Sequence, residues 1–201
     1  MQGDRTRLAT AAAVAIVLSV APVPGLAQSN AVRSRTVPSN ATMSIAAGGV
    51  SDYAETSTVP DAVETPANLT VPATYRTTVE QMLERSPMFR RQCLRLAAAP
   101  HLAVAVKMLH PFAAGPHART QITQTADGRV VAAVEINPLG DFMELLAHEL
   151  EHVIEQLDGI DLKAKAAVAE SGVRNSVGGT FETSRAVRIG SVVAFEARTR
   201  R

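Results

Sequence analysis

The chain has 201 residues, with 20 basic and 19 acidic side chains and a net charge of +1. Nothing in this balance indicates the concentrated basic surface that nucleic-acid binders and electrostatic membrane partners need. Aromatic residues make up 3% of the chain and tryptophan is absent, so stacking platforms for bases or sugars are not expected. The length and the hydrophobic fraction of 46% predict one globular domain that can carry a tail.

The N-terminal residues are typical of a secretory signal. Two arginines near the start precede an almost unbroken apolar run from Leu8 to Ala21, and Gly25 and Ala27 are small residues where a signal peptidase requires them. The run of roughly 14 residues is shorter than the ~20 that cross a bilayer, which argues against an uncleaved membrane anchor. We therefore predict a signal peptide over residues 1–27 and an exported protein, periplasmic or secreted, with no stable membrane span after cleavage.

Residues 28–70 are rich in Ser, Thr, Ala, Asn, Val and Pro and show no sustained apolar periodicity. Such a segment cannot bury enough apolar surface to offset its conformational entropy, so it is predicted to be a disordered tail or linker. The folded domain is expected over residues 71–201, about 130 residues, which is a usual size for one domain. The single cysteine, Cys93, cannot form an intramolecular disulfide and is expected to be a small buried hydrophobe.

The first half of the domain changes from helix patterns to strand patterns. Ser86 and Pro87 fit an N-cap followed by a proline at the first helical position, which separates two predicted helices. Two extended runs flank the turn signal Asp127-Gly128 and indicate a β-hairpin. The expected elements are helices over residues 73–85 and 87–98, and strands over residues 102–109, 119–125 and 130–136.

The most informative helix lies between Asp141 and Gly159. Asp141 can cap it with Glu144 as the capping-box partner, and apolar residues recur at helical spacing from Phe142 to Leu157. Gly159 is placed to end the helix in the left-handed conformation. We then expect a short helix over residues 162–169, a glycine-containing loop over residues 171–179, and a last helix that begins after Thr180.

This helix contains the motif His148-Glu149-Leu150-Glu151-His152. The two histidines are four residues apart, so both imidazoles project from one side of the helix and can bind one ion. Glu149 is rotated away from that side, but it can hold and deprotonate a metal-bound water, whose pKa zinc lowers toward ~7. The alternative is a pair of surface histidines on a solvated, acidic face. Such a string arises by chance in roughly one such chain per hundred, whereas its place in a capped amphipathic helix favours the metal site.

The sequence resembles the zincin metallopeptidases, in which a strand-rich sheet precedes a helix with the H-E-x-x-H motif. The resemblance covers about residues 130–197 and implies that His148 and His152 bind zinc and that Glu149 is the general base. In the gluzincin branch, a glutamate on a later helix completes the site, commonly followed four residues on by Asp or Ala. Glu182 with Ala186 fits this pattern.

A physical argument also favours Glu182 as the third ligand. Glu182 and the apolar residues Ala186, Ile189 and Val193 recur at helical spacing, which places the carboxylate on a face expected to be buried. A buried carboxylate needs a cationic partner, and zinc would be that partner. The alternative is an ordinary glutamate in the first helical turn, where the helix dipole favours it, or one paired with an arginine.

Two other acidic residues are alternative ligands. Asp158 stands six residues after the second histidine, where the metzincin branch has its third ligand. That branch has a glycine three residues after the second histidine, but here Glu155 is present and the continuing helix would point Asp158 away from the ion. Glu170 is a further candidate in the loop region. The residue that would stabilise an oxyanion stays open among His101, His110, His117, Arg185 and Arg188.

We expect an α+β fold with a small antiparallel or mixed sheet packed against the motif helix, and with a C-terminal glutamate-bearing helix closing the far side. The resemblance implies a zinc-dependent peptidase whose peptide or protein substrate adds to the edge of strand 130–136, and the signal-like N-terminus predicts that it is exported. Two alternatives stay open: a secreted zinc-binding or scaffold protein that cuts nothing, and a zinc hydrolase of non-peptide amides or esters. Substrate specificity and oligomeric state also stay open.

Overall fold

The computed structural model describes residues 15–20, for the backbone, and residues 59–60, 62–110, 117–125, 127–176 and 180–200. The elements are β1 (Ala15–Val20), β2 (Leu69–Thr70), the 3-10 helix η2 (Ala73–Tyr75), α1 (Arg76–Arg85), α2 (Pro87–Ala97), β3 (Leu102–Met108), β4 (Ala118–Gln124), β5 (Val130–Ile136), α3 (Phe142–Leu157), α4 (Leu162–Ala166), β6 (Val173–Ser176), β7 (Thr180–Thr183) and α5 (Ser184–Thr199). None of the described helices combines the length and apolar character needed to cross a membrane.

The larger sheet is mixed and has the strand order β1-β4-β5-β3-β2. β3 runs parallel to β2 and β5, whereas β4 runs antiparallel to β1 and β5. The α+β class and the β4–β5 hairpin expected from the sequence are confirmed, and Gly128 in the turn has the left-handed φ of +82°. The expectation that a substrate adds to the edge of β5 is wrong, because both edges of this strand are already paired.

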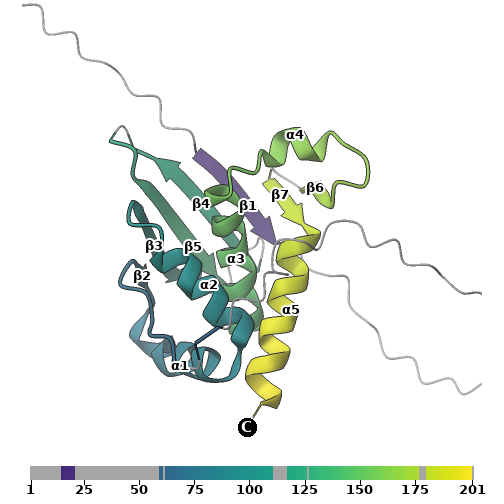
Figure 1. Cartoon of the computed structure of the whole chain (residues 1–201). Helices are drawn as coiled ribbons and strands as arrows, with labels where there is room; N and C mark the ends of the chain where they lie inside the picture. Colours follow the sequence, from purple (N-terminus) through teal and green to yellow (C-terminus); the bar gives the residue numbers. More distant parts are fainter. Residues whose placement is uncertain are drawn as a thin grey trace, which may run out of the picture. The chain divides into compact units, whose positions relative to one another are not determined.

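The helices cover one face of this sheet, as Figure 1 shows for α2 and α3. Along β3, Leu102, Val104 and Val106 are buried, while the residues between them are half-buried or exposed. β4 and β5 show the same two-residue alternation. Because successive side chains of a strand point to opposite faces, this pattern identifies one packed face and one open face.

α3 is the central element of the helical layer. It packs against α2 and α5 on the helical side and against β4 and β5 of the sheet. Every residue from Leu145 to Glu155 is buried. The helix therefore has no solvated stretch over these three turns, although its sequence places several charged residues there.

The local signals at helix ends are confirmed in two cases and wrong in one. The Ser86 hydroxyl accepts a hydrogen bond from the Phe89 N–H (3.0 Å) at the start of α2, and Gly159 has a φ of +69° just after α3. Asp141 precedes α3 but makes no side-chain cap. Its carboxylate pairs instead with Arg198 of α5, so the expected capping box does not form.

The expected loop over residues 171–179 contains a strand, which corrects the sequence interpretation. β6 and β7 form a separate two-stranded antiparallel sheet, in which Arg174 is paired with Glu182. Thr183 caps α5, and its hydroxyl accepts a hydrogen bond from the Ala186 N–H (3.0 Å). Glu182 therefore lies on β7, before the last helix, and not on the helical face that its spacing predicted.

The ordered domain begins before residue 71, the boundary expected from composition. Leu69 in β2 is 5% exposed and pairs with β3. The Asn68 side chain donates hydrogen bonds to the carbonyl groups of Leu96 (2.8 Å) and Ala99 (3.2 Å) at the end of α2. Within the predicted signal peptide, residues 15–20 form β1, and residues 21–58 lie outside the described residues. Cys93 is buried as expected, and burial raises the pKa of its thiol to about 12.

These contacts predict where truncation begins to harm the fold. A chain that starts at residue 62 lacks β1 but keeps β2 and Asn68, so it is the reference for the contribution of β2. Relative to this reference, a chain that starts at residue 71 should lose about 2–3 kcal/mol, because it exposes the site of one buried leucine and removes the Asn68 hydrogen bonds. Urea unfolding of the two truncated proteins measures this difference, and equal transitions would show that β2 contributes nothing.

Candidate metal centre

The two motif histidines face one another on the buried side of α3. His148 is 4% exposed and His152 is fully buried, and their Nε2 atoms are 3.1 Å apart. Two nitrogen ligands at 2.0–2.1 Å from a tetrahedral ion are separated by about 3.3 Å, so this spacing is close to that of a chelating pair. The alternative of surface histidines on a solvated face is therefore wrong.

Glu182 approaches the histidines from β7. Its Oε1 atom lies 3.2 Å from His148 Nε2 and 3.8 Å from His152 Nε2. One ligand atom from each of these three residues lies within 4.8 Å of the others, so the cluster could hold a metal ion. The Thr183 N–H donates a hydrogen bond to the same Glu182 oxygen (2.9 Å), which fixes the carboxylate above the imidazoles.

The choice of Glu182 from the sequence is consistent with this geometry, but the reason for it is not. The carboxylate reaches the site because the β6–β7 hairpin places residue 182 beside α3, not because it lies on the buried face of α5. The pKa of Glu182 is affected first by burial, which raises it. The hydrogen bond and charge of His148 outweigh burial and hold the pKa below its usual value.

Glu149 is fully buried between α3 and the sheet. Its Oε2 atom accepts a hydrogen bond from the Thr120 hydroxyl of β4 (2.5 Å), whereas Oε1 is buried with no hydrogen-bond partner among the described residues. Burial raises the pKa of Glu149, and the charges of His152 and His148 only partly oppose this rise. A buried carboxylate oxygen without a partner is costly, so this oxygen has unused hydrogen-bonding capacity beside the cluster.

The second histidine has a carboxylate partner on its other nitrogen. Glu155 Oε2 lies 2.9 Å from His152 Nδ1, one helical turn further along α3. Burial lowers the pKa of His152, but the Glu155 hydrogen bond and the nearby carboxylates outweigh burial, and the pKa is raised. The i+3 spacing of Glu155 from His152 places both residues on one helical face, and this spacing is the sequence signal that could have identified the contact.

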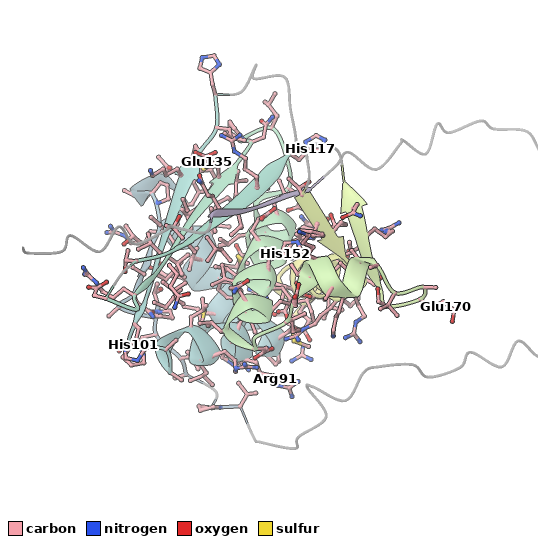
Figure 2. All side chains as sticks on the ribbon, turned by 90° about the horizontal axis from the view of Figure 1, so that it is seen from above. Arg91, His101, His117, Glu135, His152 and Glu170 are labelled. Carbon is pink, nitrogen blue, oxygen red and sulfur yellow. The ribbon has the colours of Figure 1, made fainter. Side chains whose placement is uncertain are left out.

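Other candidates from the sequence lie away from the cluster. Asp158 pairs with Arg95 and Arg185, and Glu170 is exposed with a φ of +61°. Figure 2 shows His152 among the packed elements and Glu170 and His101 toward the periphery. Of the residues considered for an oxyanion, His101, His110 and His117 are not part of the ligand group. Arg185 pairs with Glu151 and Asp158, and Arg188 is exposed.

α5 approaches α3 closely beside the first histidine, His148. Gly190 has no side chain at this contact, and a Cβ atom there would lie 2.8 Å from the Glu144 carbonyl oxygen and 3.1 Å from His148 Cβ. These distances are too short for an unmoved neighbour. The glycine therefore sets the spacing between the two helices beside His148.

Comparison with protein-family models, curated proteins and solved structures found no match to this chain.

The close contact predicts that Gly190→Ala moves α5 away from α3. The change should lower the free energy of unfolding by about 1–3 kcal/mol through overpacking, in spite of the better helix propensity of alanine. Arg188→Ala is the control, because it introduces the same residue at an exposed position of α5. Thermal unfolding compares the two variants, and a Gly190→Ala protein as stable as Arg188→Ala would contradict the contact.

Proposed function

We propose that the chain is an exported zinc-dependent peptidase with a gluzincin-like site. The observation that carries this proposal is the buried cluster of His148, His152 and Glu182, beside which Glu149 has a carboxylate oxygen without a partner. Two imidazoles and one carboxylate are the protein ligands of many catalytic zinc sites, which leave a fourth position for water or substrate. Export is proposed from the signal-like N-terminus alone.

A bound zinc ion would polarise a water or a carbonyl group and lower the pKa of that water toward about 7. Glu149 would take the proton from the attacking water on its free Oε1 and pass it to the leaving amine. Glu149 is placed for both steps because Oε1 has no other hydrogen-bond partner among the described residues. The Thr120 hydrogen bond to Oε2 holds the carboxylate in one orientation during this exchange.

The sheet supports an extended peptide as the substrate. β1 is paired with β4 in an antiparallel register that places Leu18 opposite Thr120, the residue that contacts Glu149. β1 also contacts β7, the strand that carries Glu182. An extended main chain on β4 thus runs beside both the proposed base and the proposed third ligand. Because β1 belongs to the predicted signal peptide, cleavage after Ala27 would free this edge for a peptide in its place.

This placement favours a peptidase over a hydrolase of small esters. Main-chain pairing along β4 offers affinity to any extended peptide, whereas a small ester cannot use these hydrogen bonds. The mature protein should therefore cleave members of a peptide library in the presence of zinc.

The role of Glu149 is tested by Glu149→Gln. The substitution keeps the shape of the side chain and both imidazoles, so zinc content measured by atomic emission should equal that of the wild type. Peptide hydrolysis should fall by about 10²–10⁴-fold, the usual contribution of a positioned general base. A Glu149→Gln protein with wild-type turnover would remove this residue from the mechanism. Zinc binding without turnover in the wild type would favour a scaffold protein.

The role of Glu182 is tested by Glu182→Ala. Because this variant keeps only two protein ligands, its zinc affinity should fall sharply, and the stability gained from added zinc should fall with it. Glu170→Ala removes an exposed carboxylate outside the cluster and serves as the matched control. Chelator competition and thermal unfolding with and without zinc measure both effects. Equal zinc affinity in the two variants would show that another group completes the site.

A further inference from the structure

We infer that Glu155 and Thr183 form a buried clamp that joins His152 to the β7–α5 junction, so that both act as positioning residues for the metal ligands. This inference rests on the proposed metal site and extends it beyond the three ligands. The clamp is defined by two contacts: His152 Nδ1 to Glu155 Oε2 at 2.9 Å, and the Thr183 hydroxyl to Glu155 Oε1 at 2.7 Å.

The first contact fixes which nitrogen of His152 faces the cluster. The Glu155 carboxylate lies within hydrogen-bond distance of His152 Nδ1, so it accepts a hydrogen bond from the N–H at that position of the ring. The proton then stays on Nδ1, and the lone pair of Nε2 points toward His148 and Glu182, where the ion would bind. His152 is fully buried and Glu155 is 2% exposed, so water does not compete for this hydrogen bond.

The second contact ties α3 to the segment that carries the third ligand. The Thr183 hydroxyl donates to Glu155 and accepts the Ala186 N–H (3.0 Å), so one side chain both holds Glu155 and caps α5. The Thr183 backbone N–H donates to Glu182 Oε1 (2.9 Å). Thr183 is thus placed between the carboxylate that orients His152 and the carboxylate that would bind the metal.

Fold stability alone does not require the buried carboxylate of Glu155. A buried carboxylate loses its hydration, and an apolar residue of similar volume often serves stability as well or better. Glu151 shows the contrast within the same helix. It is also fully buried, but its carboxylate bonds to Gln92 (2.8 Å) and Arg185 (2.6 Å), which belong to the packing of α2 and α5. Glu155 instead contacts His152 of the cluster with one oxygen and Thr183, the neighbour of Glu182, with the other.

The test compares zinc affinity in substitutions of these two buried acids. Glu155→Ala should weaken zinc binding by about 10–100-fold, the usual effect of removing the partner of a ligating histidine. Glu155→Gln keeps an acceptor for Nδ1 but loses the charge, and its affinity should fall between those of the wild type and Glu155→Ala. Glu151→Gln, the matched control, should lose stability and keep the wild-type affinity. Chelator competition on the purified full chain gives all four values.

The contribution of Thr183 is separated from helix capping by a second set of variants. Thr183→Val removes the hydroxyl and should weaken zinc binding. Thr183→Ser keeps the hydroxyl and should therefore bind zinc with the wild-type affinity. Asp161→Ala removes an N-cap at α4, where the carboxylate accepts the Ala164 N–H (2.9 Å), and controls for the loss of a cap. Its zinc affinity should stay unchanged.

Cobalt in place of zinc provides a readout that general stability does not change. The visible absorption of bound Co²⁺ depends on ligand geometry, so Glu155→Ala and Thr183→Val should shift its bands, while Glu151→Gln and Asp161→Ala should not. If the wild type binds no metal, both the metal site and the clamp are wrong. If the wild type binds zinc and Glu155→Ala keeps its affinity and cobalt spectrum, only the clamp is wrong. Should Glu155→Ala fail to fold, the Thr183→Val and Thr183→Ser pair decides by the same two measurements.

Discussion

The complete burial of the middle of α3 is the constraint on which the rest of the structure depends. Between Leu145 and Glu155 this helix carries two histidines and three glutamates, and none of them reaches solvent to any useful extent. Each polar group must therefore find a partner within the protein. The surrounding elements supply these partners: Thr120 from β4, Gln92 from α2, Glu182 and Thr183 from β7, and Arg185 from α5.

These partners define two polar sides of α3, which differ in their hydrogen bonds and ion pairs. On one side, Glu151 is balanced by Arg185 and by the Gln92 amide, which is a complete arrangement for a structural ion pair. On the other side, His148 and His152 stand against Glu149, Glu155 and Glu182, and Glu149 keeps one unpaired oxygen. The Gln92 amide oxygen on the first side is also buried without a hydrogen-bond partner, but among the described residues only the second side groups side chains that could hold a metal ion. The buried charges thus locate the candidate chemistry on the side of α3 that faces β4 and β7.

Sequence patterns predicted the elements whose signals are local. The Ser86-Pro87 helix start, the Asp127-Gly128 hairpin and the end of α3 at Gly159 each depend on a few neighbouring residues, and the structure has all three. The β6–β7 hairpin was missed because its strands are short and their apolar periodicity is weak. Thr120 was missed because a threonine at an inward position of a strand is unremarkable until the residue across the interface is known to be Glu149. Glu182 was identified through a helical spacing that the structure does not use.

The β6–β7 hairpin shows why the position of Glu182 and metal binding would depend on one another. Two-stranded sheets are marginally stable by themselves and need packing from the rest of the domain. Among the described residues of this hairpin, none is a buried hydrophobic residue, and only Thr180 and Thr183 are buried. Its attachment to α3 therefore relies on polar contacts at Glu182 and Thr183. An ion shared by α3 and β7 would add a cross-link to a hairpin that has no buried hydrophobic residue among its described residues, so binding free energy would act directly on the order of this hairpin.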